Sequence, residues 1–147
     1  MKVGKSDAQN VLRLAYMKRV KNRVVGNVDH EMQRKACELI SLPVVKLVEY
    51  FRAHDGFLCE GSMDIDHILP KHAFGESDKE MCFHWVNLQP LERRANCRKG
   101  SKYDAAKLQH YKEVFPRLRE HCKAMARRHG YDVEWMRCVR EKFDLSK

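Results

Sequence analysis

The spacing of apolar residues predicts three helices in the first third of the chain. Apolar positions recur every three or four residues over residues 6–24 and again over residues 29–40. This is the period of a helix that buries one face. A third helix is expected from Pro43 to His54, because proline suits the first turn of a helix and apolar residues follow it at helical spacing.

The pattern becomes alternating in the middle of the chain. Residues 63–68 read Met-Asp-Ile-Asp-His-Ile and predict a short strand that ends before Pro70. Residues 71–80 are expected to form a loop, and residues 84–89 a second strand. A helix is then expected from Pro90 to about Arg98.

The last third of the chain returns to the period of helices. Helices are expected at about residues 103–114, 116–129 and 132–143, with Pro116 opening the second and Gly130 separating it from the third. The whole pattern therefore predicts an α+β protein that is mostly helical, with a strand–loop–strand–helix core between helical flanks.

Charge is distributed unevenly along the chain, which carries a net charge of +9. Residues 1–28 have a net charge of +6 and residues 93–128 one of +9, whereas residues 55–92 between them have −6. An acidic segment between two basic ones fits a metal site set among surfaces that bind a polyanion. The charge pattern therefore favours nucleic acid as the partner, ahead of the plainer interpretation that the basic helices serve solubility.

Composition narrows the class of protein further. A chain of 147 residues with 44% hydrophobic residues can build a core and is too apolar to be disordered. No apolar run approaches the roughly 18 residues that span a bilayer, and the N-terminal segment lacks the apolar stretch of a signal peptide. The six cysteines include no C-x2-C pair, so we expect reduced thiols rather than a zinc ribbon. A cytoplasmic protein is expected, or a nuclear one in a eukaryotic host.

Candidate chemistry is concentrated in an Asp-His pair and two asparagines farther along the chain. Hydrolysis of a phosphodiester needs a base near neutral pH, for which the imidazole of His67 is suited. It also needs a hard cation such as Mg²⁺, which prefers oxygen ligands of the kind that Asp66 and Asn96 carry. Neighbours on a regular strand point to opposite faces, so Asp66 and His67 reach one site only if the strand ends or twists there.

Three segments in this region carry a family resemblance. The sequence DIDHILP is followed by FHWVNLQPL and then by an N-x-x-K-G-x-K segment. Together they resemble the HNH endonucleases, also called ββα-metal or His-Me finger nucleases, in the variant with asparagine at the third position. They are most similar to small HNH proteins of phages and large DNA viruses. The resemblance covers residues 43–103 and implies a nuclease core there, between a basic N-terminal helical arm (1–42) and a C-terminal helical extension (104–147).

The resemblance implies a role for each matching residue. His67 matches the general base, Asp66 a metal ligand, and Asn87 the asparagine that braces the loop and orients the histidine. Asn96 matches the position that completes a site for Mg²⁺ or Mn²⁺, whereas Asp64 departs from the pattern, which has an aromatic residue or histidine there. No structural zinc is expected. The basic residues expected to meet DNA phosphates are Arg93, Arg94, Arg98, Lys99 and Lys102.

Several alternatives are compatible with the same residues. The chain could be a non-catalytic DNA-binding protein on a nuclease-like core, an RNase, or a structural virion or packaging protein. One active site per chain cuts one strand, so cutting both strands requires a homodimer or two encounters with the DNA. Phage or host proteins are further candidate partners. No interaction with a membrane is expected. His84, Trp85, Phe74 and Phe83 are expected in the core rather than in a ligand set, and His72 is a weaker candidate for binding phosphate or metal.

Overall fold

The computed structural model describes residues 5–21, 30–54, 63–92, 102–143 and 145. In these residues the chain is mostly helical and has one two-stranded antiparallel sheet, which confirms the α+β class. Its helices and strands are α1 (Lys5–Lys21), α2 (His30–Ile40), α3 (Val44–His54), β1 (Met63–His67), α4 (Lys79–Phe83), β2 (Leu88–Glu92), α6 (Ala105–His129) and α7 (Val133–Lys142). Three single 3-10 turns are η1 (Lys71–Ala73), η2 (Glu76–Asp78) and η3 (Trp85–Asn87).

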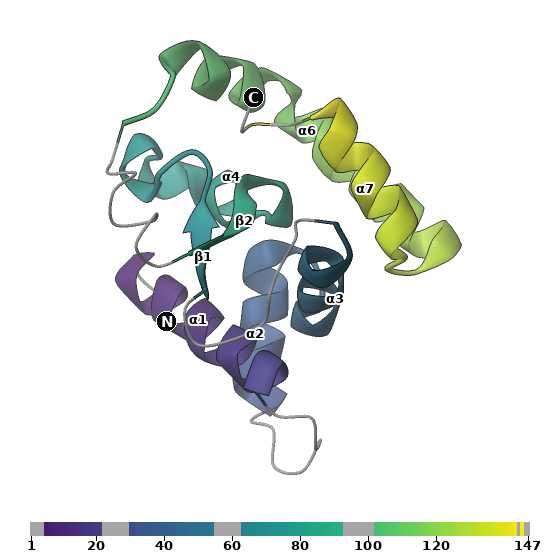
Figure 1. The fold of residues 1–147 in the computed structure, drawn as a ribbon. Helices are drawn as coiled ribbons and strands as arrows, with labels where there is room; N and C mark the ends of the chain where they lie inside the picture. The colour runs from purple at the N-terminus through teal and green to yellow at the C-terminus, as the bar shows by residue number, and fades with distance from the viewer. Residues whose placement is uncertain (1–4, 22–29, 55–62, 93–101, 144, 146–147) are drawn as a thin grey trace.

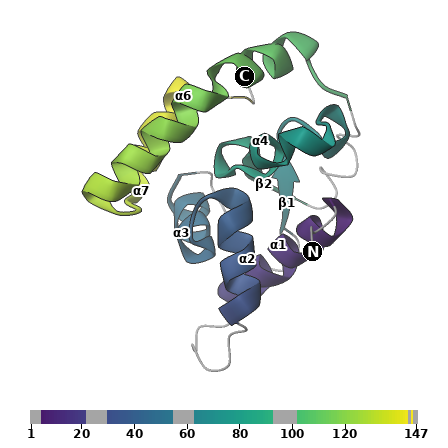
Figure 2. The same ribbon diagram turned by 180° about the vertical axis from the view of Figure 1, so that it is seen from behind.

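The helices form two groups on either side of the sheet region. Helices α1, α2 and α3 pack against one another, and α6 and α7 run side by side as a pair (Figures 1 and 2). Helix α3 also contacts α7, which joins the two groups. The short sheet and α4 lie between them, so the strands are held from both sides.

A single hydrophobic core runs through all of these elements. It includes Leu12 of α1, Phe51 of α3, Trp85 of η3, Tyr111 of α6 and Met136 of α7, each with 0% of its surface exposed. The aromatic residues expected in the core are confirmed there, because Phe74, Phe83 and Trp85 are all buried. The flanking helices therefore share the core that supports the two strands.

The helices predicted at both ends of the chain are confirmed within the described residues. Helix α1 covers the predicted segment as far as Lys21, and α2 and α3 agree with prediction to within a residue. At the C-terminal end, Asp132 caps α7 by accepting a hydrogen bond from the backbone N–H of Glu134 at 2.7 Å. Gly130 has φ +67°, a left-handed conformation that glycine adopts without strain, and it ends α6.

The loop predicted at residues 71–80 and the strand predicted at 84–89 are wrong in part. The first segment contains η1 and η2 and the start of α4, and the second begins with η3, so that β2 starts only at Leu88. A local turn explains the late start: His84 Nδ1 accepts a hydrogen bond from the backbone N–H of Val86, and its carbonyl accepts one from Asn87. Because the turn buries consecutive side chains, the apolar run in this segment does not alternate as a strand would.

The helix predicted from Pro90 is wrong at its start. Residues Pro90 to Glu92 complete β2 and pair with β1, with Pro90 opposite Ile65. Within the described residues the sheet has two strands, so β2 is an edge strand there, where a proline without an N–H is tolerated. The remainder of that predicted helix, residues 93–98, lies outside the described residues.

The prediction that Pro116 separates two helices is also wrong. Helix α6 continues through Pro116, which lies on the exposed side of the helix and so leaves its buried face intact. The buried residues of α6 continue at helical spacing on both sides of the proline: Tyr111, Val114, Phe115, Leu118 and Cys122. Packing of this continuous stripe outweighs the cost of one missing backbone hydrogen bond.

Candidate active site at the end of strand β1

The pairing of β1 with β2 sets the directions of the two residues of the Asp-His pair. Asp66 lies opposite Gln89, and His67 lies opposite Leu88. Residues opposite each other in an antiparallel pair share a face, and neighbours on a strand point to opposite faces. His67 is the last residue of β1. The regular strand therefore ends at the point where it must end for Asp66 and His67 to serve one site.

Asp66 is buried and is held by a side chain of the neighbouring strand. Its Oδ2 atom accepts a hydrogen bond from Gln89 Nε2 at 2.9 Å, and 7% of the residue is exposed. Because Gln89 is directly opposite in the sheet, the register itself fixes this contact. The carboxylate is therefore held in place at the end of β1, with an amide group beside it.

His67 is buried against the end of α4. Its ring lies edge-on to Phe83, with centroids 4.9 Å apart and planes at 89°, and 5% of the residue is exposed. Phe83 is the last residue of α4, so this short helix, which the sequence did not predict, sets the position of the imidazole. A base that activates water must meet that water, so catalysis by His67 requires its imidazole to become more accessible than it is in this structure.

Asn87 links its own segment of backbone to the turn after β1 and to the end of α4, close to the Asp66–His67 pair. Its Oδ1 accepts a hydrogen bond from the N–H of Leu69 at 2.8 Å, and its Nδ2 donates to the carbonyls of Leu69 (3.1 Å) and Cys82 (2.9 Å). The backbone carbonyl of Asn87 also accepts a hydrogen bond from Ile68 at 2.8 Å. With 0% of its surface exposed, Asn87 fixes the turn that follows His67 to the last turn of α4.

A buried arginine from the C-terminal helix reaches the same region. Arg140 of α7 donates hydrogen bonds through Nη2 to the carbonyls of Trp85 and Leu88, which flank Asn87, and its guanidinium lies 5.7 Å from the ring centroid of Tyr50. Sequence reasoning missed this residue. A signal was present, because Arg140 follows Met136 by one helical turn and so interrupts the apolar face of α7 with a charge.

His84 lies in the core, as expected, and its environment keeps it neutral. Burial, with a smaller contribution from the charge of Arg119, lowers the pKa of His84 from 6.5 to about 3. Its ring lies edge-on to Phe115 at 5.4 Å, and its Nδ1 accepts the hydrogen bond from Val86. His84 therefore supports the η3 turn as an uncharged side chain.

A cavity of about 210 Å³ lies beside the Asp66–Gln89 pair. Gln89 forms part of its wall together with Ile68 and Leu69, the residues whose backbone Asn87 holds. Lys102, the one predicted phosphate-binding residue that the structure describes, also lines this cavity. The other four, Arg93, Arg94, Arg98 and Lys99, and the predicted metal ligand Asn96 lie outside the described residues.

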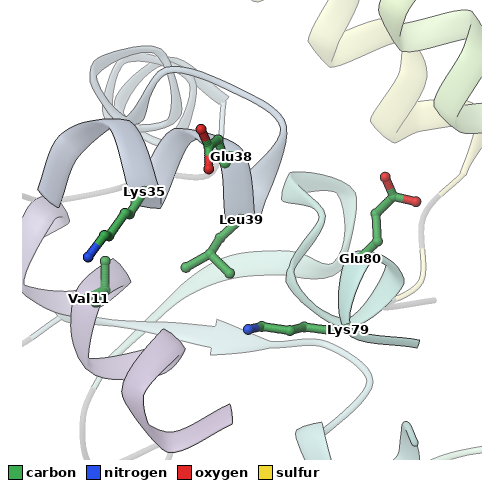
Figure 3. Close-up of a pocket in the computed structure, with 6 residues that line it drawn as sticks. All are labelled: Val11, Lys35, Glu38, Leu39, Lys79 and Glu80. Carbon is green, nitrogen blue, oxygen red and sulfur yellow. The ribbon is translucent and has the colours of Figure 1, made fainter. Parts of the chain in front are cut away.

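A second cavity, of about 340 Å³, lies between α1, α2 and α4 (Figure 3). Its charged residues are Lys35, Glu38, Lys79 and Glu80, two of each sign. Glu38 is paired with Arg34 at 2.7 Å and Glu80 with Arg119 at 2.8 Å. This cavity shares no lining residue with the site at the end of β1 and offers it no catalytic group.

The described residues include no group of three or more His, Cys, Asp or Glu side chains placed to hold a metal ion. Cys82 and Cys122 are buried, and burial raises the pKa of Cys122 to about 12. Of the two cysteines that flank the Asp-His motif in the sequence, Cys82 is buried and Cys59 lies outside the described residues.

Comparison of the chain with models of known protein families, with characterised proteins and with solved structures finds no match. Among the helices that the structure describes, none is both long and apolar enough to cross a membrane.

Proposed function

We propose that this chain is a metal-dependent DNA endonuclease of the HNH, or ββα-metal, type. The observation that carries the proposal is a pair of contacts at the end of β1, one made by Asn87 and the other by Gln89. Asn87 holds the backbone just after His67 through two side-chain hydrogen bonds to Leu69 and ties it to α4 through a third to Cys82, and the antiparallel register places Gln89 opposite Asp66. A base and a carboxylate ligand must keep fixed positions relative to the scissile phosphate, and this bracing supplies that rigidity.

Each residue then has a specific task in hydrolysis. His67 takes a proton from the attacking water, for which a neutral imidazole is suited near pH 7. Asn87 keeps the turn after β1 in place and so fixes the direction from which the imidazole approaches. Gln89 orients the Asp66 carboxylate through its hydrogen bond of 2.9 Å.

The oxygen atoms at the end of β1 fit a hard divalent cation. The Asp66 carboxylate is a hard oxygen ligand of the kind that Mg²⁺ prefers, and the donor nitrogen of Gln89 holds it in place. Asp66 would hold Mg²⁺ or Mn²⁺ together with Asn96. When bound, such an ion neutralises the negative charge that grows on the phosphate and on the departing 3′ oxygen.

The basic segments supply the surface for the DNA backbone. The exposed cations of α6 include Arg117, Lys123, Arg127 and Arg128, and those of α1 include Arg13. Phosphate contacts of this kind position a nuclease without reading sequence. One active site per chain then produces a nick, with a 5′ phosphate as the family resemblance implies.

The burial of the Asp-His pair supports a second candidate function. Asp66 and His67 are only 7% and 5% exposed, which suits a non-catalytic DNA-binding protein that keeps the pair for packing. The nuclease proposal therefore requires DNA binding to open a path for water to His67. An RNase is a further alternative, because the chemistry of one phosphodiester resembles that of another.

Incubation of the purified chain with supercoiled plasmid separates these functions. Nicking in Mg²⁺ or Mn²⁺ that stops in EDTA and returns when the ion is restored is the expected result. Binding of DNA without any nicking would favour the non-catalytic alternative. Cleavage of an RNA strand but not of the matched DNA strand would identify an RNase.

A further inference from the structure

The cavity beside Gln89 has features that the cleavage chemistry does not use. Its walls come from the turn after β1 and from the segment around the start of α6, where Lys102, Tyr103, Asp104 and Lys107 line it. Gln89 both lines the cavity and donates to Asp66, so this side chain links the cavity to the carboxylate proposed to hold the metal.

The two lysines give this cavity a positive rim. Lys102 is exposed and Lys107 is half-buried, and neither forms a salt bridge within the part of the chain that the structure describes. The acidic residue between them, Asp104, caps α6 by accepting hydrogen bonds from Ala106 at 2.8 Å and from the backbone N–H of Lys107 at 3.4 Å. Its carboxylate is thus directed to the helix end, which leaves both ammonium groups available to an anionic ligand.

Tyr103 provides an aromatic surface at the same place. The residue is 43% exposed, and its ring lies edge-on to His72, with centroids 5.5 Å apart and planes at 67°. The contact with His72 supports one edge of the ring, while its exposed part stays open to solvent. A tyrosine held in this way can stack with a planar group at a small cost in conformational entropy.

The size of the cavity limits what it can hold. At about 210 Å³ it is smaller than the roughly 300–1,000 Å³ of sites that enclose a complete small-molecule ligand. Two cations and one exposed aromatic ring match the phosphate and the base of a single nucleotide. In a duplex both faces of each base are covered by its neighbours, so only an unpaired or extruded base can stack with the tyrosine.

We propose that this cavity binds one unpaired DNA nucleotide next to the scissile phosphate, with its base on Tyr103 and its phosphate between Lys102 and Lys107. The inference rests on the proposed function and deepens it, because it makes DNA with an unpaired nucleotide beside the cut the preferred substrate. Frayed ends, branches and single strands meet that requirement, whereas an intact duplex does not.

Fluorescence of a single-stranded oligonucleotide that contains 2-aminopurine tests the site directly, because stacking on a tyrosine quenches this base. The variant Tyr103→Ala is expected to bind the single strand about 5- to 150-fold more weakly than the wild type and to lose the quenching. Tyr103→Phe retains an aromatic face and is expected to keep both. Tyr131→Ala is the matched control, since Tyr131 is 38% exposed and lies beyond the far end of α6.

Nicking of a plasmid, measured in parallel, separates a failure of this site from a failure of the endonuclease. If Tyr103→Ala binds and quenches the labelled strand as the wild type does, the nucleotide site is wrong, whether or not the chain cuts DNA. If Tyr103→Ala loses both and Tyr131→Ala keeps both, the nucleotide site stands even when the wild type cuts nothing, and only the endonuclease is then wrong. A thermal unfolding midpoint equal to that of the wild type shows that a loss of binding in Tyr103→Ala comes from the removed ring.

Discussion

Replacing Asn87 by alanine removes the contacts that hold the turn after β1. The side chain makes three hydrogen bonds to backbone groups, two of them with Leu69 and one with Cys82. Both of these residues are buried, so water does not replace the lost partners without rearrangement of the core. Three backbone groups would thus lose a partner in a region that is shielded from solvent.

The expected loss of stability follows from the number of bonds. A typical intramolecular hydrogen bond contributes about 1 kcal/mol net, and an unsatisfied buried group costs about 1–3 kcal/mol. Three bonds therefore predict that Asn87→Ala lowers the free energy of unfolding by about 3 kcal/mol or more. For a protein of this size, that corresponds to a fall of roughly 6–12 °C in the unfolding midpoint.

Urea unfolding followed by circular dichroism measures this change. Asn10→Ala is a suitable control, because Asn10 is an exposed asparagine of α1 whose side chain bonds only to Arg13 among the described residues. If Asn87→Ala changes the free energy of unfolding by no more than Asn10→Ala does, the three hydrogen bonds do not hold the turn and the bracing assigned to Asn87 is wrong.

Three further predictions follow from other parts of the structure. Arg140→Met should lower the free energy of unfolding by about 2–4 kcal/mol, because it removes charged hydrogen bonds to two carbonyls. Arg137→Met, on the exposed side of α7, should lower the free energy of unfolding less. Equal effects of the two variants in urea unfolding would contradict the role of Arg140. Because the pKa of His84 is lowered from 6.5 to about 3, its contribution to stability is complete above pH 6.5 and declines as the pH falls toward 3, by about 1.4 kcal/mol per pH unit. Unfolding of His84→Gln, measured between pH 7 and pH 5, should lack this component, and a slope like that of the wild type would show that His84 does not carry it. Affinity for duplex DNA should fall by about 5 units in log K per tenfold increase in salt if ~6 phosphates are neutralised, and titrations that show no salt dependence would exclude binding through the basic helices.

Local patterns predicted the helices well and the turn chemistry around the candidate site poorly. Helix α2 followed from apolar spacing and α3 from apolar spacing together with Pro43 at its start, because each helix buries one face in the common core. The start of β2 did not follow, since the bond from the Val86 N–H to His84 Nδ1 closes a turn where the sequence reads as a strand. The period of the apolar residues carries no information about a side chain that accepts a backbone hydrogen bond.

Contacts between distant segments were the hardest to predict. The continuation of α6 through Pro116 depends on a stripe of buried residues, which outweighs a local rule that is correct for isolated helices. Arg140 bonds to carbonyls more than 50 residues earlier in the chain, so its role requires the packing of α7 against the region of η3. Within the candidate site, the order of Asp66, His67 and Asn87 in the sequence indicated which residues to consider, but it did not indicate that the first two are buried.

The contribution of His67 to cleavage is the most direct test of the proposed function. Nicking of supercoiled plasmid in Mg²⁺ by the wild type and by His67→Ala should be measured together with the affinity of each protein for DNA. The proposed function predicts that the variant binds DNA with nearly the affinity of the wild type and produces no nicked plasmid. Nicking by His67→Ala at the rate of the wild type would contradict it.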